Sequence, residues 1–215
     1  MAKAKKDNTK LSAYILLDRT GSMVTRWDEA LSSVNAYVKQ LAKDKTKGSV
    51  TLALFDRHAG GIQFDVIRDK LSPDDWKPVS NEDATPRGDT PLYDAVGRLV
   101  TLAEKEDAKK TVLVVMTDGA ENASQEFNRE SAKAALERCK TKGWQVVFLG
   151  ADFDAVSQGQ TVGVATANSL NMSAGNYRSV AESLASKTMA YATMDCAMTF
   201  SADDRKNATL LNPKK

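Results

Sequence analysis

The sequence predicts an α/β fold: a Rossmann-like, doubly wound central sheet that is mostly parallel, has one antiparallel edge strand, and carries helices on both faces. Two observations support this fold class. Runs of aliphatic and β-branched residues, such as residues 14–17 and 112–116, are typical of strands buried on both faces. Segments with helical apolar spacing alternate with these runs, and such alternation predicts a parallel sheet between two helical layers.

The first half of the chain is expected to contain a strand, a helix and a hairpin. Residues 27–41 place an apolar side chain at every third or fourth position, which predicts a helix with one buried face. The sequence His-Ala-Gly-Gly at 58–61 predicts a tight turn that leads into an antiparallel edge strand. The strands predicted around these features span residues 13–18, 49–55 and 62–67. A polar connection over 69–89 follows, and connections of this length are commonly functional.

The second half continues the alternation of helices and strands. Pro91 suits the first position of a helix, so the next helix is expected to begin there with Thr90 as its N-cap. Gly143 is expected to end a later helix. The remaining predicted elements are a strand over 111–117, a helix over 128–142, a strand over 144–149, a short helix near 153–159, a strand over 168–172 and a final helix over 177–194.

The chain has 215 residues, of which 42% are hydrophobic and 27% charged, as in an ordinary globular domain. We expect a flexible basic N-terminal tail over 1–11, one domain over 12–200 and a C-terminal tail over 201–215. No apolar run reaches the ~18–20 residues that span a membrane, and no secretory signal precedes Leu11. Cys139 and Cys196 are then expected to be reduced, so a cytoplasmic location is predicted, with neither a membrane nor a nucleic acid as partner.

Oxygen-bearing side chains follow two of the predicted strands. Asp18, Thr20 and Ser22 come directly after the first strand, and Asp118 comes after the strand over 111–117. Thr90, at the expected helix start, supplies a third hydroxyl. The carboxyl ends of parallel strands meet at one edge of the sheet, which is where open α/β sheets bind ligands. Two carboxylates and three hydroxyls suit a hard divalent cation, so the sequence predicts a metal site.

These fragments resemble the metal-ion-dependent adhesion site of the von Willebrand factor type A family, whose pattern is Asp-x-Ser-x-Ser, a distant Thr and a later Asp. The resemblance extends from Tyr14 to about Met194. Thr20 stands where the family usually has Ser, and it keeps the hydroxyl. The segments 117–124 and 150–154 resemble small stand-alone members encoded by bacteria and phages.

The resemblance implies Mg²⁺ as the bound ion, with Mn²⁺ or Ca²⁺ also admissible. It implies that Thr20 and Ser22 offer hydroxyls to the metal, that Asp18 and Asp118 act directly or through water, and that Thr90 changes between direct and indirect coordination. It further implies a protein partner whose Asp or Glu completes the coordination shell. Two carboxylates only neutralise a dication, so an acidic ligand is chemically reasonable.

Other functions fit the sequence less well than metal-dependent protein binding does. A structural or assembly protein could use the metal only to hold loops together. A phosphotransferase of the haloacid-dehalogenase type would use Asp18 as nucleophile, but the general acid expected two positions later is replaced by Thr20. A phosphate-binding loop of the flavodoxin type would place an anion beside two aspartates. A serine hydrolase lacks its Gly-x-Ser-x-Gly motif. We therefore expect no catalytic activity.

Several neighbours of the site are left with open roles. Arg19 either lies on the rim of the site, where it could attract an acidic residue of a partner, or has a plain surface role. Asp94 either supports the metal loop or only favours a helix start. Asn122 either caps a helix or contacts a partner. Trp76 is either an exposed interface residue or packs against the sheet edge.

Overall fold

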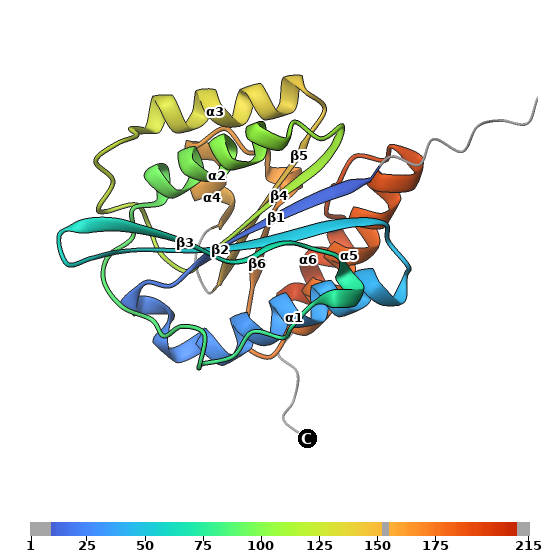
Figure 1. The fold of residues 1–215 in the computed structure, drawn as a ribbon, viewed down its shortest axis with the longest axis horizontal. Coiled ribbons are helices and arrows are strands. Elements are labelled where there is room, and N and C mark those ends of the chain that lie inside the picture. Colours follow the sequence, from blue (N-terminus) through green and yellow to red (C-terminus); the bar gives the residue numbers. More distant parts are fainter. Residues whose placement is uncertain (1–9, 152–154, 210–215) are drawn as a thin grey trace, which may run out of the picture.

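The computed structural model describes residues 10–151 and 155–209, and it confirms the predicted fold class (Figure 1). A six-stranded sheet has the order β3-β2-β1-β4-β5-β6. All neighbouring strands pair in parallel except β2 and β3, which form the antiparallel edge hairpin. The strands are β1 (Leu11–Asp18), β2 (Gly48–His58), β3 (Gly61–Leu71), β4 (Lys110–Thr117), β5 (Gln145–Ala151) and β6 (Ser169–Met172).

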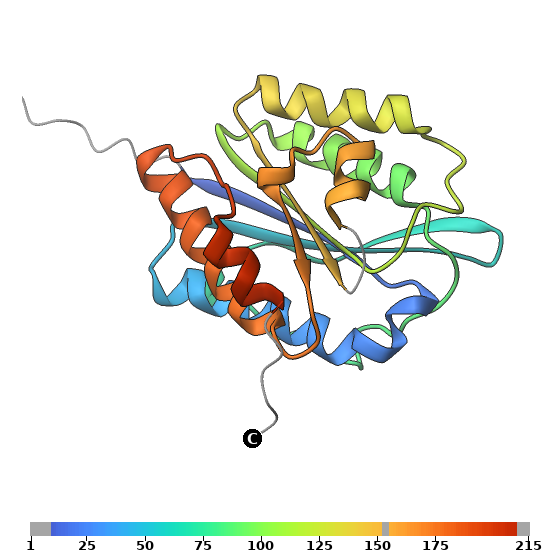
Figure 2. The same ribbon diagram turned by 180° about the vertical axis from the view of Figure 1, so that it is seen from behind.

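Helices cover both faces of the sheet, as the two ribbon views show (Figure 2). One face carries α1 (Trp27–Lys43), α5 (Tyr177–Met194) and α6 (Ala202–Thr209). The other carries α2 (Leu92–Glu106), α3 (Arg129–Thr141) and α4 (Ala155–Thr161). Three short 3-10 helices, η1 (Gly21–Arg26), η2 (Pro73–Asp75) and η3 (Thr166–Asn168), lie in the connections of the described residues. None of the helices in the described ranges combines the length and hydrophobicity of a membrane-spanning segment.

Strand β1 shows why the core has two halves. All of its residues are buried, and alternate side chains point to opposite faces of the sheet. Ile15 and Leu17 pack into the cluster beneath α1 and α5. Tyr14 and Leu16 pack into the cluster beneath α2 and α3. This burial on both faces explains the unbroken apolar run in the sequence.

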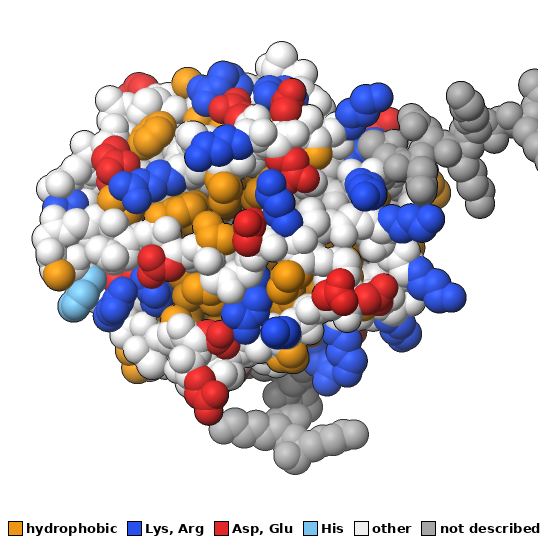
Figure 3. All heavy atoms as spheres, in the orientation of Figure 1, with side chains coloured by type: hydrophobic (Ala, Val, Ile, Leu, Met, Phe, Trp, Pro, Cys, Tyr) orange, Lys and Arg blue, Asp and Glu red, His pale blue; other side chains and the backbone are white. Residues whose placement is uncertain are grey.

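Local signals in the sequence account for several element ends. In the β2–β3 hairpin, Ala59 and Gly60 both have positive φ, 51° and 84°, as a tight hairpin turn requires. Asn128 caps α3 by accepting the Ser131 N–H at 2.9 Å, while Ser131 accepts the Asn128 N–H in return. Gly143 follows α3 with φ of 77°. Figure 3 shows side chains of both charges interspersed on the face that it presents.

Expectations about the two chain ends and the last helix need correction, and the short helix is described only in part. Residues 201–215 were expected to form a tail, but α6 occupies part of that range and packs against β6 and α5, with Ala208 buried. The helix over 177–194 is therefore not the last one. The predicted short helix near 153–159 begins at Ala155 in the structure, and residues 152–154 lie outside the described residues. Strand β1 also begins at Leu11, one residue before the predicted domain start.

Candidate metal centre

The predicted site lies where the strand order of the sheet reverses. From β1 the chain moves first to β2 on one side and later to β4 on the other, so β1 and β4 are neighbours. Leu17 pairs with Met116 in their parallel register. Asp18 at the end of β1 and Asp118 just after β4 therefore emerge side by side at the carboxyl edge. This is the point of an open α/β sheet at which ligands bind.

Asp18 is fully buried, with 0% of the residue exposed. Its Oδ1 accepts the N–H of Thr20 at 2.8 Å, and its Oδ2 accepts the hydroxyl of Thr117 at 2.5 Å. Burial raises the pKa of Asp18 to about 6, although hydrogen bonds from Thr117 and Thr20 oppose the rise; the nearby charge of Asp118 adds to it. The carboxylate has hydrogen bonds but no neighbouring cation among the described residues.

The three predicted hydroxyls and Asp118 form one chain of hydrogen bonds. Thr90 donates its hydroxyl to Thr20 Oγ1 at 3.3 Å, and Thr20 Oγ1 lies 3.1 Å from Ser22 Oγ. Ser22 donates to Asp118 Oδ1 at 2.6 Å. The structure thus brings together all five residues that the sequence pointed to, with Asp18 joined through the Thr20 amide.

Gly119 allows this close approach. A β-carbon at this position would lie 3.1 Å from Thr90 Oγ1 and 3.6 Å from Ser22 Oγ. It would crowd the space between the two hydroxyls. A glycine here leaves the hydroxyls from two separate loops facing a common space.

Thr90 does not cap α2 as expected. The helix begins at Leu92 with Pro91 as its N-cap residue, and the Thr90 side chain accepts none of the first N–H groups; Glu121 and Ser124 accept those of Tyr93 and Asp94. The hydroxyl of Thr90 is directed at Thr20 instead. Asn122 holds the Thr90 backbone from both sides: the Thr90 N–H donates to Asn122 Oδ1 at 2.8 Å, and the Asn122 N–H donates to the Thr90 carbonyl at 3.1 Å. Asn122 therefore positions Thr90, a role that neither of its two alternatives described.

Arg19 is not on the rim of the site. It is 5% exposed, and its guanidinium pairs with the buried carboxylate of Asp56 and with Asp65 at 2.7 Å. Arg87 reaches the second oxygen of Asp56 at 3.0 Å. Backbone hydrogen bonds join the same loops: Gly21 N–H to the Gly88 carbonyl at 3.0 Å and Arg87 N–H to the Arg19 carbonyl at 2.8 Å. These hydrogen bonds therefore join the loop over residues 19–22 to the segment over 87–89, which leads to Thr90.

The acidic residues next to α2 support a loop and do not reach the hydroxyl chain. Asp94 is 0% exposed and accepts backbone N–H groups from Gln125, Glu126 and Phe127 at 2.7–2.8 Å. Glu121 accepts the N–H groups of Tyr93, Ala123 and Ser124 at 2.6–2.9 Å. These bonds fix residues 121–127 against the start of α2. Neither of the two alternatives for Asp94 describes this role.

The donor set fits a small divalent cation. In residues 10–151 and 155–209, no group of three or more His, Cys, Asp and Glu side chains is placed to hold a metal. The candidate site instead offers two carboxylates and three hydroxyls, all of them oxygen ligands. Mg²⁺ and Mn²⁺ accept such ligands together with water, whereas zinc and copper sites use imidazole or thiolate.

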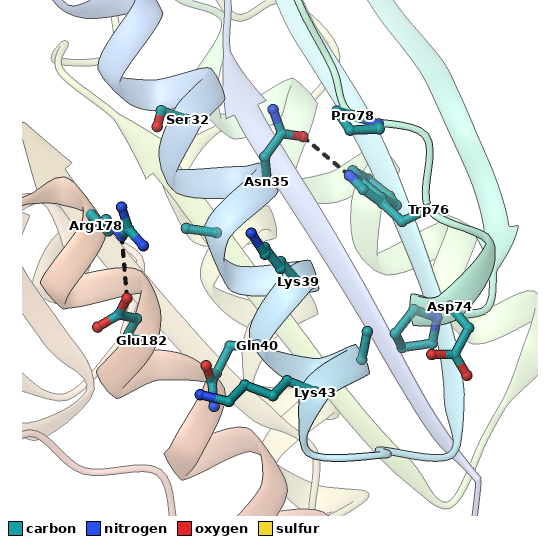
Figure 4. Close-up of a pocket in the computed structure, with 13 residues that line it drawn as sticks. Ser32, Asn35, Lys39, Gln40, Lys43, Asp74, Trp76, Pro78, Arg178 and Glu182 are labelled. Carbon is teal, nitrogen blue, oxygen red and sulfur yellow. Dashed lines mark hydrogen bonds and ion pairs between the residues drawn. The ribbon is translucent and has the colours of Figure 1, made fainter.

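A groove lies on another part of the surface. A groove of about 750 Å³ runs along α1 between residues 73–78 and α5 (Figure 4). Trp76 lines it, half-buried, and donates its indole N–H to Asn35 Oδ1 at 3.1 Å. Trp76 is therefore joined to α1 and packs against the core cluster beneath that helix. No residue of the candidate metal centre lines this groove.

The family of the chain follows from its sequence profile. The von Willebrand factor type A domain matches residues 13–190, which is most of the chain and includes every residue of the candidate site. This chain belongs to the von Willebrand factor type A domain family. None of the curated proteins searched matches it in sequence.

Several solved structures share the fold. The pilus adhesin SpaC from Lactobacillus rhamnosus GG aligns with a TM-score of 0.63 and 12% identity over 86% of this chain and 31% of its own. Proximal thread matrix protein 1 from the mussel byssus gives 0.58 and 15% over 84% and 48%. The SpRpn10 VWA domain gives 0.53 and 14% over 81% and 94%. The chain thus spans less than half the length of the adhesin and the byssus protein.

Proposed function

We propose that this type A domain binds a protein partner through a divalent metal ion, Mg²⁺ in the first instance, with an Asp or Glu of the partner completing the coordination shell. Asp18, Thr20, Ser22, Thr90 and Asp118 would hold the ion. The family membership of the chain supports a role in binding. The metal dependence is our inference from the geometry of the site.

One observation carries the proposal: Asp18 is a fully buried carboxylate without a cation of its own among the described residues. Burying an uncompensated charge costs several kcal/mol, and proteins retain such groups where a ligand compensates them. The hydroxyls of Thr20, Ser22 and Thr90 converge beside it. A dication at this position would neutralise both carboxylates.

Each residue of the candidate site has a separate role. Asp18 and Asp118 supply negative charge, the three hydroxyls supply neutral oxygens, and Asn122 keeps Thr90 in place. When bound, the metal supplies a Lewis-acidic position at the sheet edge for a carboxylate. Ser22 is exposed, so the site is accessible to a side chain of another protein.

A purely structural metal is the second candidate. In that case the ion would be needed to join the loops. The loops, however, are already joined through the Gly21–Gly88, Arg87–Arg19 and Thr90–Asn122 hydrogen bonds. This network favours a metal that serves recognition.

We also propose that the domain is not an enzyme. Ser22 donates its hydroxyl to Asp118, so it is not paired with a histidine base. His58, the single histidine of the sequence, ends β2 as an exposed residue. Thr20 belongs to the hydroxyl chain and provides no acid two positions after Asp18.

A cytoplasmic location and a relationship to small bacterial and phage members remain proposals. Cys139 and the exposed Cys196 are both free thiols, which suits a reducing compartment. The fragments 117–124 and 150–154 support the relationship. The pilus adhesin among the structural neighbours shares only the fold.

A pull-down from a native lysate tests the proposed function. The baits are wild type with Mg²⁺, wild type with EDTA, Asp118→Ala with Mg²⁺, and the control Asp89→Ala, which removes an exposed acid beside Thr90. A protein retained by wild type and Asp89→Ala in Mg²⁺, and lost in the other two conditions, supports a metal-bridged contact. A partner retained under all four conditions shows that binding occurs elsewhere.

A further inference from the structure

Arg26 makes a contact with the candidate site that the family pattern of Asp, Ser and Thr does not include. Its Nη1 lies 2.9 Å from Asp118 Oδ2, and the two side chains are 24% and 1% exposed. The other oxygen of Asp118 accepts the Ser22 hydroxyl at 2.6 Å. Asp118 is thus shared between the hydroxyl chain and an arginine.

The local fold places Arg26 there. It is the last residue of η1, and buried residues on either side, Met23 and Trp27, anchor that short helix to the core. The Met23 N–H donates to the Thr20 carbonyl at 3.0 Å, and the Trp27 indole donates to the Ala84 carbonyl at 3.1 Å. The segment between Ser22 and Trp27 is therefore held at both ends.

The two carboxylates of the site have different surroundings. Asp18 has hydrogen bonds alone, whereas Asp118 has a guanidinium partner. We infer that Arg26 sets the charge of the site: it weakens metal binding and strengthens the binding of an acidic ligand to the metal-loaded site. This inference rests on the proposed function.

The charges give the sign of both effects. A dication with Asp18 and Asp118 has a total charge of zero, and the guanidinium of Arg26 adds one positive charge beside this group. The guanidinium repels the incoming dication, so neutralising Arg26 favours metal binding. The same positive charge attracts a carboxylate, so neutralising it disfavours the acidic ligand. Adding or removing one charge a few ångströms from the metal, in a partly solvated site, changes binding affinities by roughly three- to tenfold.

The opposite signs separate this role from a structural one. If Arg26 only held Asp118 in place, its loss would loosen the site, and both metal and ligand would bind more weakly. An electrostatic role makes the metal bind more tightly and the ligand more weakly. Arg26→Lys keeps the charge, so it is expected to stay close to wild type in both measurements.

The test uses Mn²⁺ as the metal and trifluoroacetate as the carboxylate. Calorimetry measures Mn²⁺ affinity, and the ¹⁹F relaxation caused by protein-bound Mn²⁺ measures the approach of trifluoroacetate. The variants are Arg26→Gln, Arg26→Met as a second neutral replacement, and Arg26→Lys. Arg138→Gln is the matched control, since it removes the same charge from the exposed Arg138–Glu104 pair on α3.

We expect Arg26→Gln and Arg26→Met to bind Mn²⁺ roughly three- to tenfold more tightly and trifluoroacetate several-fold more weakly, with Arg138→Gln unchanged. Equal or weaker Mn²⁺ binding by both neutral variants overturns the role of Arg26 and leaves the proposed function standing. Absence of Mn²⁺ binding by wild type overturns the proposed function itself.

Discussion

Asp18 and Asp56 are two buried carboxylates at the ends of adjacent parallel strands. Both are 0% exposed, and Asp18 pairs with Phe55, the residue just before Asp56. Asp56 is neutralised within the chain by Arg19 and Arg87. Asp18 accepts hydrogen bonds from the Thr20 amide and the Thr117 hydroxyl, and neither of these groups carries a charge.

The difference shows how to separate a structural acid from a ligand-binding one. Burial alone does not distinguish them. A buried acid with arginine partners already has its charge compensated, so its role is to join the loops that those arginines belong to. A buried acid with hydrogen bonds alone still lacks a compensating charge. In this chain the second kind of acid lies beside three converging hydroxyls.

The largest expected effect comes from removing the charge of Asp56. Asp56→Asn leaves Arg19 buried without its main partner, and breaking a buried pair in this way costs about 3–5 kcal/mol. Asp18→Asn removes an uncompensated charge, so without metal its cost is expected to stay below about 1 kcal/mol. Urea unfolding in EDTA measures both variants. Equal losses in the two variants would contradict the comparison.

Added metal is expected to stabilise the protein through Asp18 and not through Asp56. At a free Mg²⁺ or Mn²⁺ concentration one hundred times its Kd, wild type gains about 2.7 kcal/mol of stability. Asp18→Asn is expected to gain nothing. The measurement is urea unfolding with metal and with EDTA. A metal-induced gain that persists in Asp18→Asn would place the ion at another site.

The effect of Asn122 on metal binding can be measured separately from its effect on the stability of the fold. Asn122→Ala removes the acceptor of the Thr90 N–H, and loss of such support typically weakens metal binding, here by roughly tenfold. Asn128→Ala is the matched control: it removes the cap of α3 and costs about 1 kcal/mol of stability. Calorimetry with Mn²⁺ should show an effect only for Asn122→Ala. A similar loss in both variants would reduce the role of Asn122 to stability.

A third acid extends the comparison at smaller magnitude. Burial alone would raise the pKa of Asp204, but hydrogen bonds with Lys187, Ser183 and Ser201 outweigh it and hold the pKa well below its usual range. Its folded pKa lies below the unfolded value, so its contribution is present above about pH 4 and is lost as the pH falls further.

Asp204→Asn should therefore cost about 1 kcal/mol at pH 7, and the difference from wild type should shrink between pH 4 and pH 2. Urea unfolding over that pH range measures it. A difference that does not depend on pH would show that the charge of Asp204 contributes nothing.

The sequence predicted the fold, and it pointed to residues that the structure brings together, because strand ends are local features. Asp18, Thr20, Ser22 and Asp118 follow apolar runs directly, and parallel strands bring their ends together. Thr90 was identified for a reason that proved wrong, since it does not cap α2. Helix α6 was missed because its sequence is almost wholly polar, with Ala208 its one buried residue.

Residues that pair across loops could not be found from local patterns. Arg19, Arg26 and Asn122 act through partners 37, 92 and 32 positions away in the chain. The sequence shows only a charged or polar side chain at each position. Which partner it meets depends on how the loops pack after the sheet has formed.

The central position of β1 also has a kinetic consequence. The loop with Asp18 and the loop with Asp118 follow strands that are neighbours in the sheet, whereas β2, β3 and α2 separate them in the sequence. An ion that needs both loops has nothing to hold it in a partly folded chain. We therefore expect bound metal to slow unfolding and to leave the rate of folding almost unchanged, because the rate-limiting step precedes the assembly of its ligands.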